Sequence, residues 1–249
     1  MPYLQDFPDE LLFLIRDTPN LAKSIHIPAQ SGSTTNLERM QRGYSRECYI
    51  SLIDRIREII PSVGLSSDFI AGFCGETEEE HRDTLSLLEH VKYEQAFMFA
   101  YSLREKTKAH RSLQDDVPEE VKAARLQEVI ATFQRVKKAK IREHINTYQC
   151  VLIEGPNKKE KDSWLGRADN GLRVIVRPHG LQPEDSSLLS GSSGFQNGST
   201  PVAPSLAPGS LVLARITDSH FALYGTAVAA TSLSGFERQR QEMLQCMKH

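Results

Sequence analysis

The spacing of the apolar residues changes near residue 146, and this change constrains the fold more than any other feature. Before it, short β-rich runs at 24–28, 65–71 and 95–101 alternate with stretches of helical periodicity; after it, apolar residues recur at every second position. The first pattern is typical of a parallel α/β sheet, and the second of a small β-barrel. We therefore predict an α/β domain over residues 1–146 and a β-barrel domain over residues 147–232.

Helices are expected on either side of the predicted strands of the first domain. The patterns predict helices over 8–20, over 45–60 with Ser45 as its N-cap, and over 77–91 with Thr77 as its N-cap. A longer helix begins near Asp116 and has basic residues as far as Arg142. Glycines at 72 and 75 predict a tight turn after the second strand. The third strand is almost continuously apolar, so we expect it to be buried on both faces.

The second domain is predicted from four further runs, at 149–153, 171–176, 210–216 and 221–229, joined by glycine and Asx turns. Residues 181–209 contain 15 Gly, Pro or Ser in 29 positions, which predicts a flexible insertion inside this domain. The residues from 233 to 249 are predicted to form a polar tail.

Charge is distributed unevenly along the chain. The total is 30 basic and 32 acidic residues, but residues 118–182 hold 13 basic and 8 acidic side chains, a local net charge of +5. A basic segment of this kind favours a nucleic-acid partner, although a charge run is also typical of a solvated face. The candidate RNA-binding residues are Lys158, Lys159, Lys161, Arg167 and Arg173.

The cysteines and the hydropathy pattern exclude several classes of protein. The four cysteines, at 48, 74, 150 and 246, lack the close spacing that binds zinc or an iron–sulfur cluster, so no metal ligand is predicted. No apolar run reaches the roughly 18 residues of a membrane span, and no membrane partner is expected. The first residues have no secretory-signal pattern.

Two loops of the first domain contain candidate binding residues. Ser31-Gly32-Ser33 follows a strand and is either a site for a ribose, carboxylate or phosphate, with Arg42 downstream, or an ordinary strand-to-helix turn. Asp68 lies in an apolar strand, where a carboxylate is costly unless it is hydrogen-bonded, so it either faces a ligand or is held structurally. His26 is interpreted as a structural histidine.

Five blocks of the sequence resemble successive blocks of the MiaB-type radical S-adenosylmethionine tRNA methylthiotransferases. They are Leu21–Ser33, Met40–Arg46, Ser66–Thr77, Tyr101–Ala109 and Asp115–Glu120. The resemblance implies the C-terminal part of a radical-SAM (βα) barrel, followed by a TRAM-like antiparallel β-barrel that binds tRNA. The implied reaction is 2-methylthiolation of N6-isopentenyladenosine in the anticodon loop, and the implied partner is the anticodon stem-loop.

The same resemblance implies S-adenosylmethionine and two [4Fe–4S] clusters as cofactors of the complete family protein. The family's cluster-binding cysteine motifs are absent from this chain, so we expect an inactive fragment or isoform with no catalytic residue of its own. The implied location is mitochondrial, or cytoplasmic or nuclear for a truncated form. The residues expected to contact the cofactor are Gln30, Ser31, Ser33, Arg42, Asp68 and Glu76.

Two alternatives to an enzyme remain. One is an RNA-binding module without catalysis. The other is a regulatory protein that binds a kinase activator, an interpretation suggested by the name of an animal mitochondrial family member and by no residue in this sequence.

Overall fold

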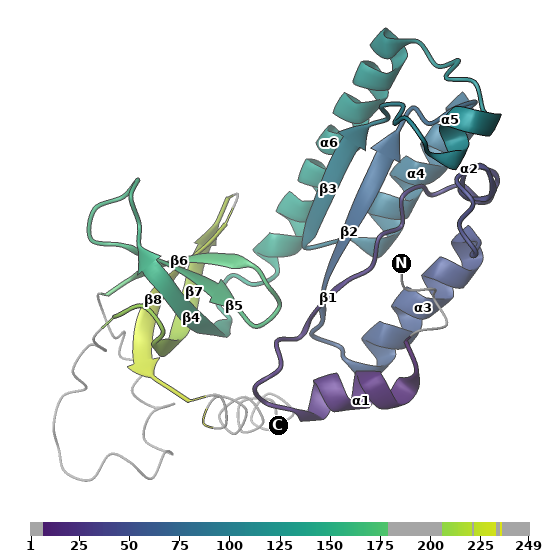
Figure 1. Cartoon of the computed structure of the whole chain (residues 1–249). Helices are drawn as coiled ribbons and strands as arrows, with labels where there is room; N and C mark the ends of the chain where they lie inside the picture. Colours follow the sequence, from purple (N-terminus) through teal and green to yellow (C-terminus); the bar gives the residue numbers. More distant parts are fainter. Residues whose placement is uncertain (1–6, 179–205, 221, 233–234, 236–249) are drawn as a thin grey trace, which may run out of the picture. The chain divides into compact units, whose positions relative to one another are not determined.

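The computed structural model describes residues 7–178, 206–220, 222–232 and 235 (Figure 1). The chain divides into two compact units, of which the first contains residues 23–140 and the second the residues from 141 onward. Most of the predicted insertion at 181–209 and of the predicted tail at 233–249 lies outside the described residues. No described helix is long and apolar enough to cross a membrane.

The first unit is built on a three-stranded parallel sheet, which confirms the predicted α/β architecture. Its strands, β1 (Ser24–His26), β2 (Gly64–Ala71) and β3 (Gln95–Ala100), lie in the order β1-β2-β3. The helices are α1 (Asp9–Asp17), α2 (Thr34–Arg39), α3 (Arg46–Ile59), α4 (Glu78–Val91), α5 (Lys108–Ser112) and α6 (Glu119–Arg142). Both α2 and α5 are too short to show the apolar periodicity of a helix, and the sequence did not predict them.

The predicted helix caps and glycine turn are confirmed. The Ser45 side chain accepts a hydrogen bond from the backbone N–H of Cys48 at the start of α3. At the start of α4, Thr77 and Glu80 form a capping box, in which each side chain binds the other residue's backbone N–H. In the turn after β2, Gly72 and Gly75 both have positive φ, a conformation that disfavours side chains.

The side chains of β2 alternate between a covered and an open face of the sheet. Leu65 and Phe69 are buried in the same apolar cluster as Ile53 of α3, Leu87 of α4 and Val129 of α6. On the opposite face, residues 66, 68 and 70 are each partly exposed. The helices therefore cover one face of this sheet.

The expectation that β3 is buried on both faces is wrong. Phe97 is 43% exposed and Phe99 is 55% exposed, whereas Ala96 of the same strand is buried in the apolar cluster that the helices share. The reason is that β3 is an edge strand of a sheet that the helices cover on one face only. The side chains of β3 on the other face therefore stay exposed although they are apolar.

The second unit is a closed five-stranded barrel in the order β4-β5-β6-β8-β7. Its strands are β4 (Tyr148–Pro156), β5 (Trp164–Ala168), β6 (Arg173–Arg177), β7 (Leu211–Ser219) and β8 (Leu223–Ala230). The purely antiparallel arrangement expected from the sequence is wrong for one pair, because β6 and β8 run parallel. A closed ring with an odd number of strands cannot alternate direction at every step, so at least one pair must be parallel.

Candidate functional site

The loops that follow the three parallel strands form the carboxyl edge of the sheet. Gln30, just after β1, has a φ of 67° and continues the pairing with β2. Its N–H donates to the carbonyl of Asp68 at 2.8 Å, and its carbonyl accepts from Ile70 N–H at 2.9 Å. The loop after β1 therefore lies directly beside the end of β2, where parallel sheets commonly bind ligands.

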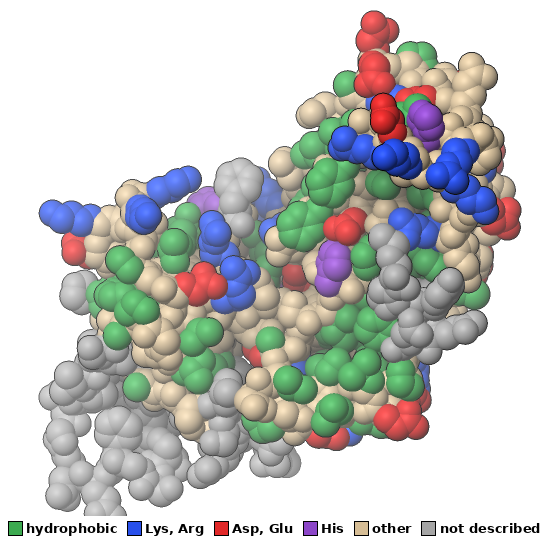
Figure 2. Space-filling model, viewed as in Figure 1, with side chains coloured by type: hydrophobic (Ala, Val, Ile, Leu, Met, Phe, Trp, Pro, Cys, Tyr) green, Lys and Arg blue, Asp and Glu red, His purple; other side chains and the backbone are tan. Residues whose placement is uncertain are grey.

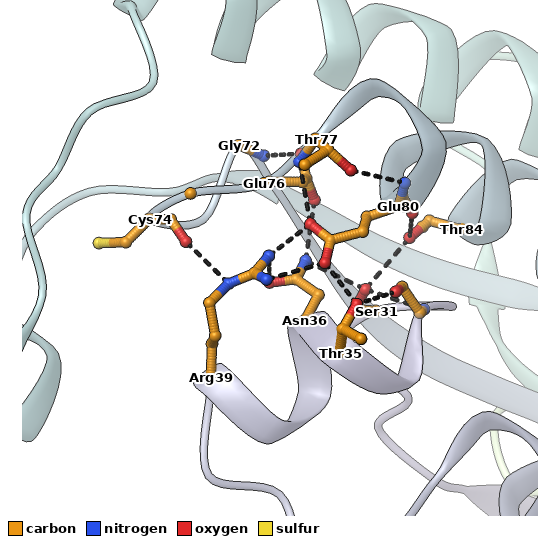
Figure 3. Close-up of polar contacts among 12 residues, drawn as sticks. Ser31, Thr35, Asn36, Arg39, Gly72, Cys74, Glu76, Thr77, Glu80 and Thr84 are labelled. Atoms are coloured by element: carbon orange, nitrogen blue, oxygen red, sulfur yellow. Dashed lines mark hydrogen bonds and ion pairs between the residues drawn. The ribbon is translucent and has the colours of Figure 1, made fainter.

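Glu76 is buried at this edge, with both carboxylate oxygens hydrogen-bonded (Figure 3). One oxygen accepts from Gly72 N–H at 2.7 Å and from Arg125 at 3.1 Å, and the other accepts from Asn36 at 3.1 Å. Burial raises the pKa of Glu76, and the Gly72 N–H and the Arg125 guanidinium oppose that rise. Glu76, which the family resemblance expects to contact a cofactor, ties the Gly72–Glu76 turn to α2 and α6 in this structure.

A second ion pair, between the partly exposed Arg39 of α2 and the buried Glu80 of α4, lies beside the first. Thr35 donates to Glu80 at 2.5 Å, and Arg39 also donates to the Cys74 carbonyl at 3.2 Å. Burial raises the pKa of Glu80, but the hydrogen bonds from Arg39, Thr35 and the Thr77 N–H outweigh it and lower the pKa to about 2. Glu80 is therefore an ionised carboxylate that fixes α2 against α4.

The serine loop after β1 is held by the same helices. Ser31 Oγ lies 3.3 Å from Thr84 Oγ1 and accepts from Asn36 at 3.2 Å, and the Gly32 N–H donates to Thr84 at 2.9 Å. Ser33 Oγ lies 3.0 Å from the Thr35 hydroxyl. The structure thus brings Ser31 and Glu76 together through the Asn36 amide, and these polar groups bind one another.

Two predicted residues lie elsewhere. Arg42 follows α2, where its backbone N–H donates to the Leu37 carbonyl at 2.9 Å. Asp68 lies on the open face of the sheet, with a side chain that is 30% exposed. His26 is close to it, with Nε2 3.4 Å from Asp68 Oδ2 and Nδ1 2.9 Å from the Ser66 hydroxyl.

The residues that the sequence reasoning missed are those that hold the loops: Asn36, Arg39, Glu80 and Arg125. A signal for Arg125 was present, since it lies four residues before Val129, on the same face of α6 as the apolar stripe. A charged residue in register with buried ones predicts a buried ion pair. The signal gives no indication of its partner, because Glu76 is 49 residues away in the chain.

The barrel unit contains the predicted RNA-binding residues. The three lysines at 158, 159 and 161 are exposed on the segment between β4 and β5, and Arg173 is exposed on β6. Arg167 differs from them, because it is ion-paired with Glu154 at 2.9 Å. Trp164 packs partly against the barrel core.

Within the described part of the chain, no three His, Cys, Asp or Glu side chains gather as a metal site would require. Cys74 and Cys150 are buried in different units, and Cys48 is exposed. Cys246 lies outside the described residues. These cysteines do not fit an iron–sulfur cluster, which needs several thiolates converging on one point.

We predict that this chain, reconstituted anaerobically with iron and sulfide, binds no stoichiometric [4Fe–4S] cluster, because its thiols are dispersed. Iron analysis and visible absorption measure the outcome, and a ferredoxin treated in parallel shows that the reconstitution works. About four irons per chain with a cluster spectrum would contradict the prediction.

Comparison with known proteins identifies relatives of this sequence. The model of the Radical SAM superfamily matches residues 2–88. A "CDK5RAP1-like protein" of Oryza sativa subsp. japonica is 48% identical over 241 residues, which cover 94% of this chain and 37% of that protein. The "Mitochondrial tRNA methylthiotransferase CDK5RAP1" of Mus musculus is 52% identical over 174 residues, 70% of this chain and 30% of that protein.

A bacterial relative extends the comparison. The "tRNA-2-methylthio-N(6)-dimethylallyladenosine synthase" of Chloroherpeton thalassium is 45% identical over 181 residues, which cover 73% of this chain and 40% of that protein. The chain thus spans 30 to 40% of the length of these curated relatives. By sequence, the chain is homologous to the C-terminal part of radical SAM tRNA methylthiotransferases of the CDK5RAP1 and MiaB type.

Proposed function

We propose that this chain forms the C-terminal part of a tRNA methylthiotransferase that converts N6-isopentenyladenosine to its 2-methylthio derivative. The observation that carries the proposal is the open face of the parallel sheet. His26 and Asp68 lie there, within the segment that the Radical SAM superfamily model matches, beside the exposed rings of Phe97 and Phe99 on β3. In this proposal the sheet is part of a radical-SAM (βα) barrel, and the open face lines its interior.

S-adenosylmethionine, when bound with an iron–sulfur cluster, supplies the radical chemistry of such enzymes. The described cysteines do not fit a cluster, so we assign both [4Fe–4S] clusters of the complete protein to parts of the relatives that this chain does not match. Ser31, Ser33 and Glu76 are hydrogen-bonded to the protein. Their proposed role is to shape the loops at the carboxyl edge, and Asp68, which is partly exposed, is the carboxylate available to a ligand.

The proposed role of the barrel is that of a TRAM-like domain that binds the anticodon stem-loop of tRNA. Lysines at 158, 159 and 161 and Arg173 present exposed positive charge that suits phosphate contacts. Arg167 contributes less in this proposal, because Glu154 already neutralises it. The proposed location, mitochondrial, follows the names of relatives such as the mouse protein. Binding of a kinase activator rests on a relative's name alone.

Replacing Lys158, Lys159 and Lys161 by Ala should weaken tRNA binding and make it less sensitive to salt. Each lost phosphate contact lowers the slope of log affinity against log salt by about 0.7 to 0.9, so three give a change of roughly 2 to 3. Fluorescence anisotropy with a labelled tRNA at several salt concentrations measures both quantities.

A control triple variant replaces three exposed basic residues of the first unit, Lys106, Lys108 and Arg111, by Ala. It removes the same charge and should leave the salt slope nearly unchanged. Equal losses of tRNA affinity in the two triple variants would show that binding depends only on the net charge of the chain. That result would contradict the assignment of the site to the barrel.

A further inference from the structure

The open face of the sheet contains one contiguous group of side chains. None of them belongs to the hydrogen-bonded network that joins the loops to α2, α4 and α6. In the register of β2 and β3, Asp68 lies opposite Phe97 and Ile70 lies opposite Phe99. The His26 ring packs edge-on against Phe97, with ring centroids 6.2 Å apart. Figure 2 shows hydrophobic side chains gathered beside a histidine in the first unit. We call this group, comprising His26, Asp68, Ile70, Phe97 and Phe99, the aromatic face.

The polar part of the aromatic face is oriented by its neighbours. His26 is held between the Ser66 hydroxyl at 2.9 Å and Asp68 Oδ2 at 3.4 Å. Asp68 is 30% exposed, and a carboxylate has more acceptor positions than this single contact uses. The face therefore presents one oriented hydrogen-bond acceptor next to two exposed phenyl rings.

We infer that the aromatic face recognises the base of N6-dimethylallyladenosine, with Phe97 and Phe99 in contact with the dimethylallyl group and Asp68 accepting a hydrogen bond from N6–H. This inference rests on the proposed function and adds to it the residues that select a prenylated adenine. The bacterial relative's name, "tRNA-2-methylthio-N(6)-dimethylallyladenosine synthase", contains that group.

The chemistry of the ligand matches the aromatic face in two ways. The dimethylallyl group is a branched five-carbon hydrocarbon, and contact with it would remove apolar surface of both phenylalanines from water. The N6 nitrogen keeps one hydrogen after prenylation, so a carboxylate acceptor suits the modified base. An aromatic ring also stacks on nucleobases in general, which is why the prenyl preference, and not base binding alone, is the property to test.

The experiment measures binding of two nucleosides, N6-dimethylallyladenosine and adenosine, to the whole chain by isothermal titration calorimetry. We expect the prenylated nucleoside to bind about tenfold or more tightly, because discrimination of apolar groups of this size lies in that range. Phe97→Ala and Phe99→Ala should reduce the ratio of the affinity for N6-dimethylallyladenosine to that for adenosine. Phe97→Leu, which retains an apolar side chain, should reduce this ratio less. The matched control is Phe13→Ala on α1, which removes a phenyl ring that is 38% exposed and should leave the ratio unchanged.

The contribution of Asp68 has its own test. Asp68→Asn should weaken the binding of both nucleosides by a similar factor, since both ligands have an N6–H. The ratio of the two affinities should therefore stay unchanged. N6,N6-dimethyladenosine, which has no N6–H, should bind the original chain and Asp68→Asn equally. Thermal melting of each variant shows that it is folded.

Equal binding of the two nucleosides, or no saturable binding of either by the folded chain, would overturn the inference. So would a prenyl preference that persists in both phenylalanine variants. The proposed function is tested separately, because tRNA binding depends on the barrel lysines. Salt-dependent tRNA binding without a prenyl preference would therefore contradict this inference alone.

Discussion

Replacing Arg125 by Met should lower the free energy of unfolding of the first unit by about 3 to 5 kcal/mol. Arg125 donates to the Glu76 carboxylate at 3.1 Å and to the Glu76 carbonyl at 2.8 Å, and Glu76 is buried. Methionine keeps much of the side-chain volume but leaves a buried carboxylate without its cation. Most of the loss comes from that uncompensated charge.

Urea denaturation at two pH values tests the cause as well as the size of this effect. Burial without Arg125 should raise the pKa of Glu76 further, so the folded variant binds a proton more readily than the unfolded chain does. The unfolding free energy of the variant should then fall as pH rises, and the loss relative to the original chain should be larger at about pH 7 than at about pH 4.

Arg135→Met is the matched control for this prediction, because Arg135 lies on the same helix and pairs with Glu89 at 2.5 Å. Its side chain is 64% exposed, so the same substitution should cost less than about 1 kcal/mol. Similar losses in the two variants, or a loss in Arg125→Met that does not change with pH, would contradict the explanation by a buried charge.

Gly166→Ala should destabilise the barrel by about 1 to 3 kcal/mol through steric overlap. A Cβ atom on Gly166 of β5 would lie 2.4 Å from Val151 Cγ1 and 2.7 Å from the Leu152 carbonyl oxygen, both on the adjacent strand β4. The carbonyl belongs to the strand backbone, so relief of the overlap would require movement of the strand itself.

Gly155→Ala makes the same chemical change on β4, where a Cβ atom would have no neighbour within 4 Å. This control should be neutral or stabilise the barrel by up to about 1 kcal/mol, because alanine restricts the unfolded chain. Hydrogen exchange of the β4 and β5 amides measures the stability of the barrel in both variants. Equal protection in the two variants would show that the barrel tolerates the additional methyl group at Gly166.

The sequence predicted the elements of this protein where local patterns are strong. The Thr77 capping box, the Ser45 cap and the three parallel strands follow from spacing and side-chain chemistry alone, and the structure confirms them. Strand β5 was missed because Gly166 and Arg167 interrupt its short apolar pattern. Its place in the barrel depends on pairing with both β4 and β6, which is a long-range property.

The sequence named candidate site residues but not the partners that surround them, and the reason is physical. The sequence placed Ser31 in a loop after one predicted strand and Asp68 within the next, and its family resemblance added Glu76 in the turn that follows, at the edge where loops after parallel strands meet. It did not distinguish Glu76, which is buried against Arg125, from Asp68, which is partly exposed. A residue type and its spacing set the chemistry that a position can supply. Burial and ion pairing depend on partners such as Arg125, 49 residues away, so only the tertiary structure decided which carboxylate holds the fold and which is left available.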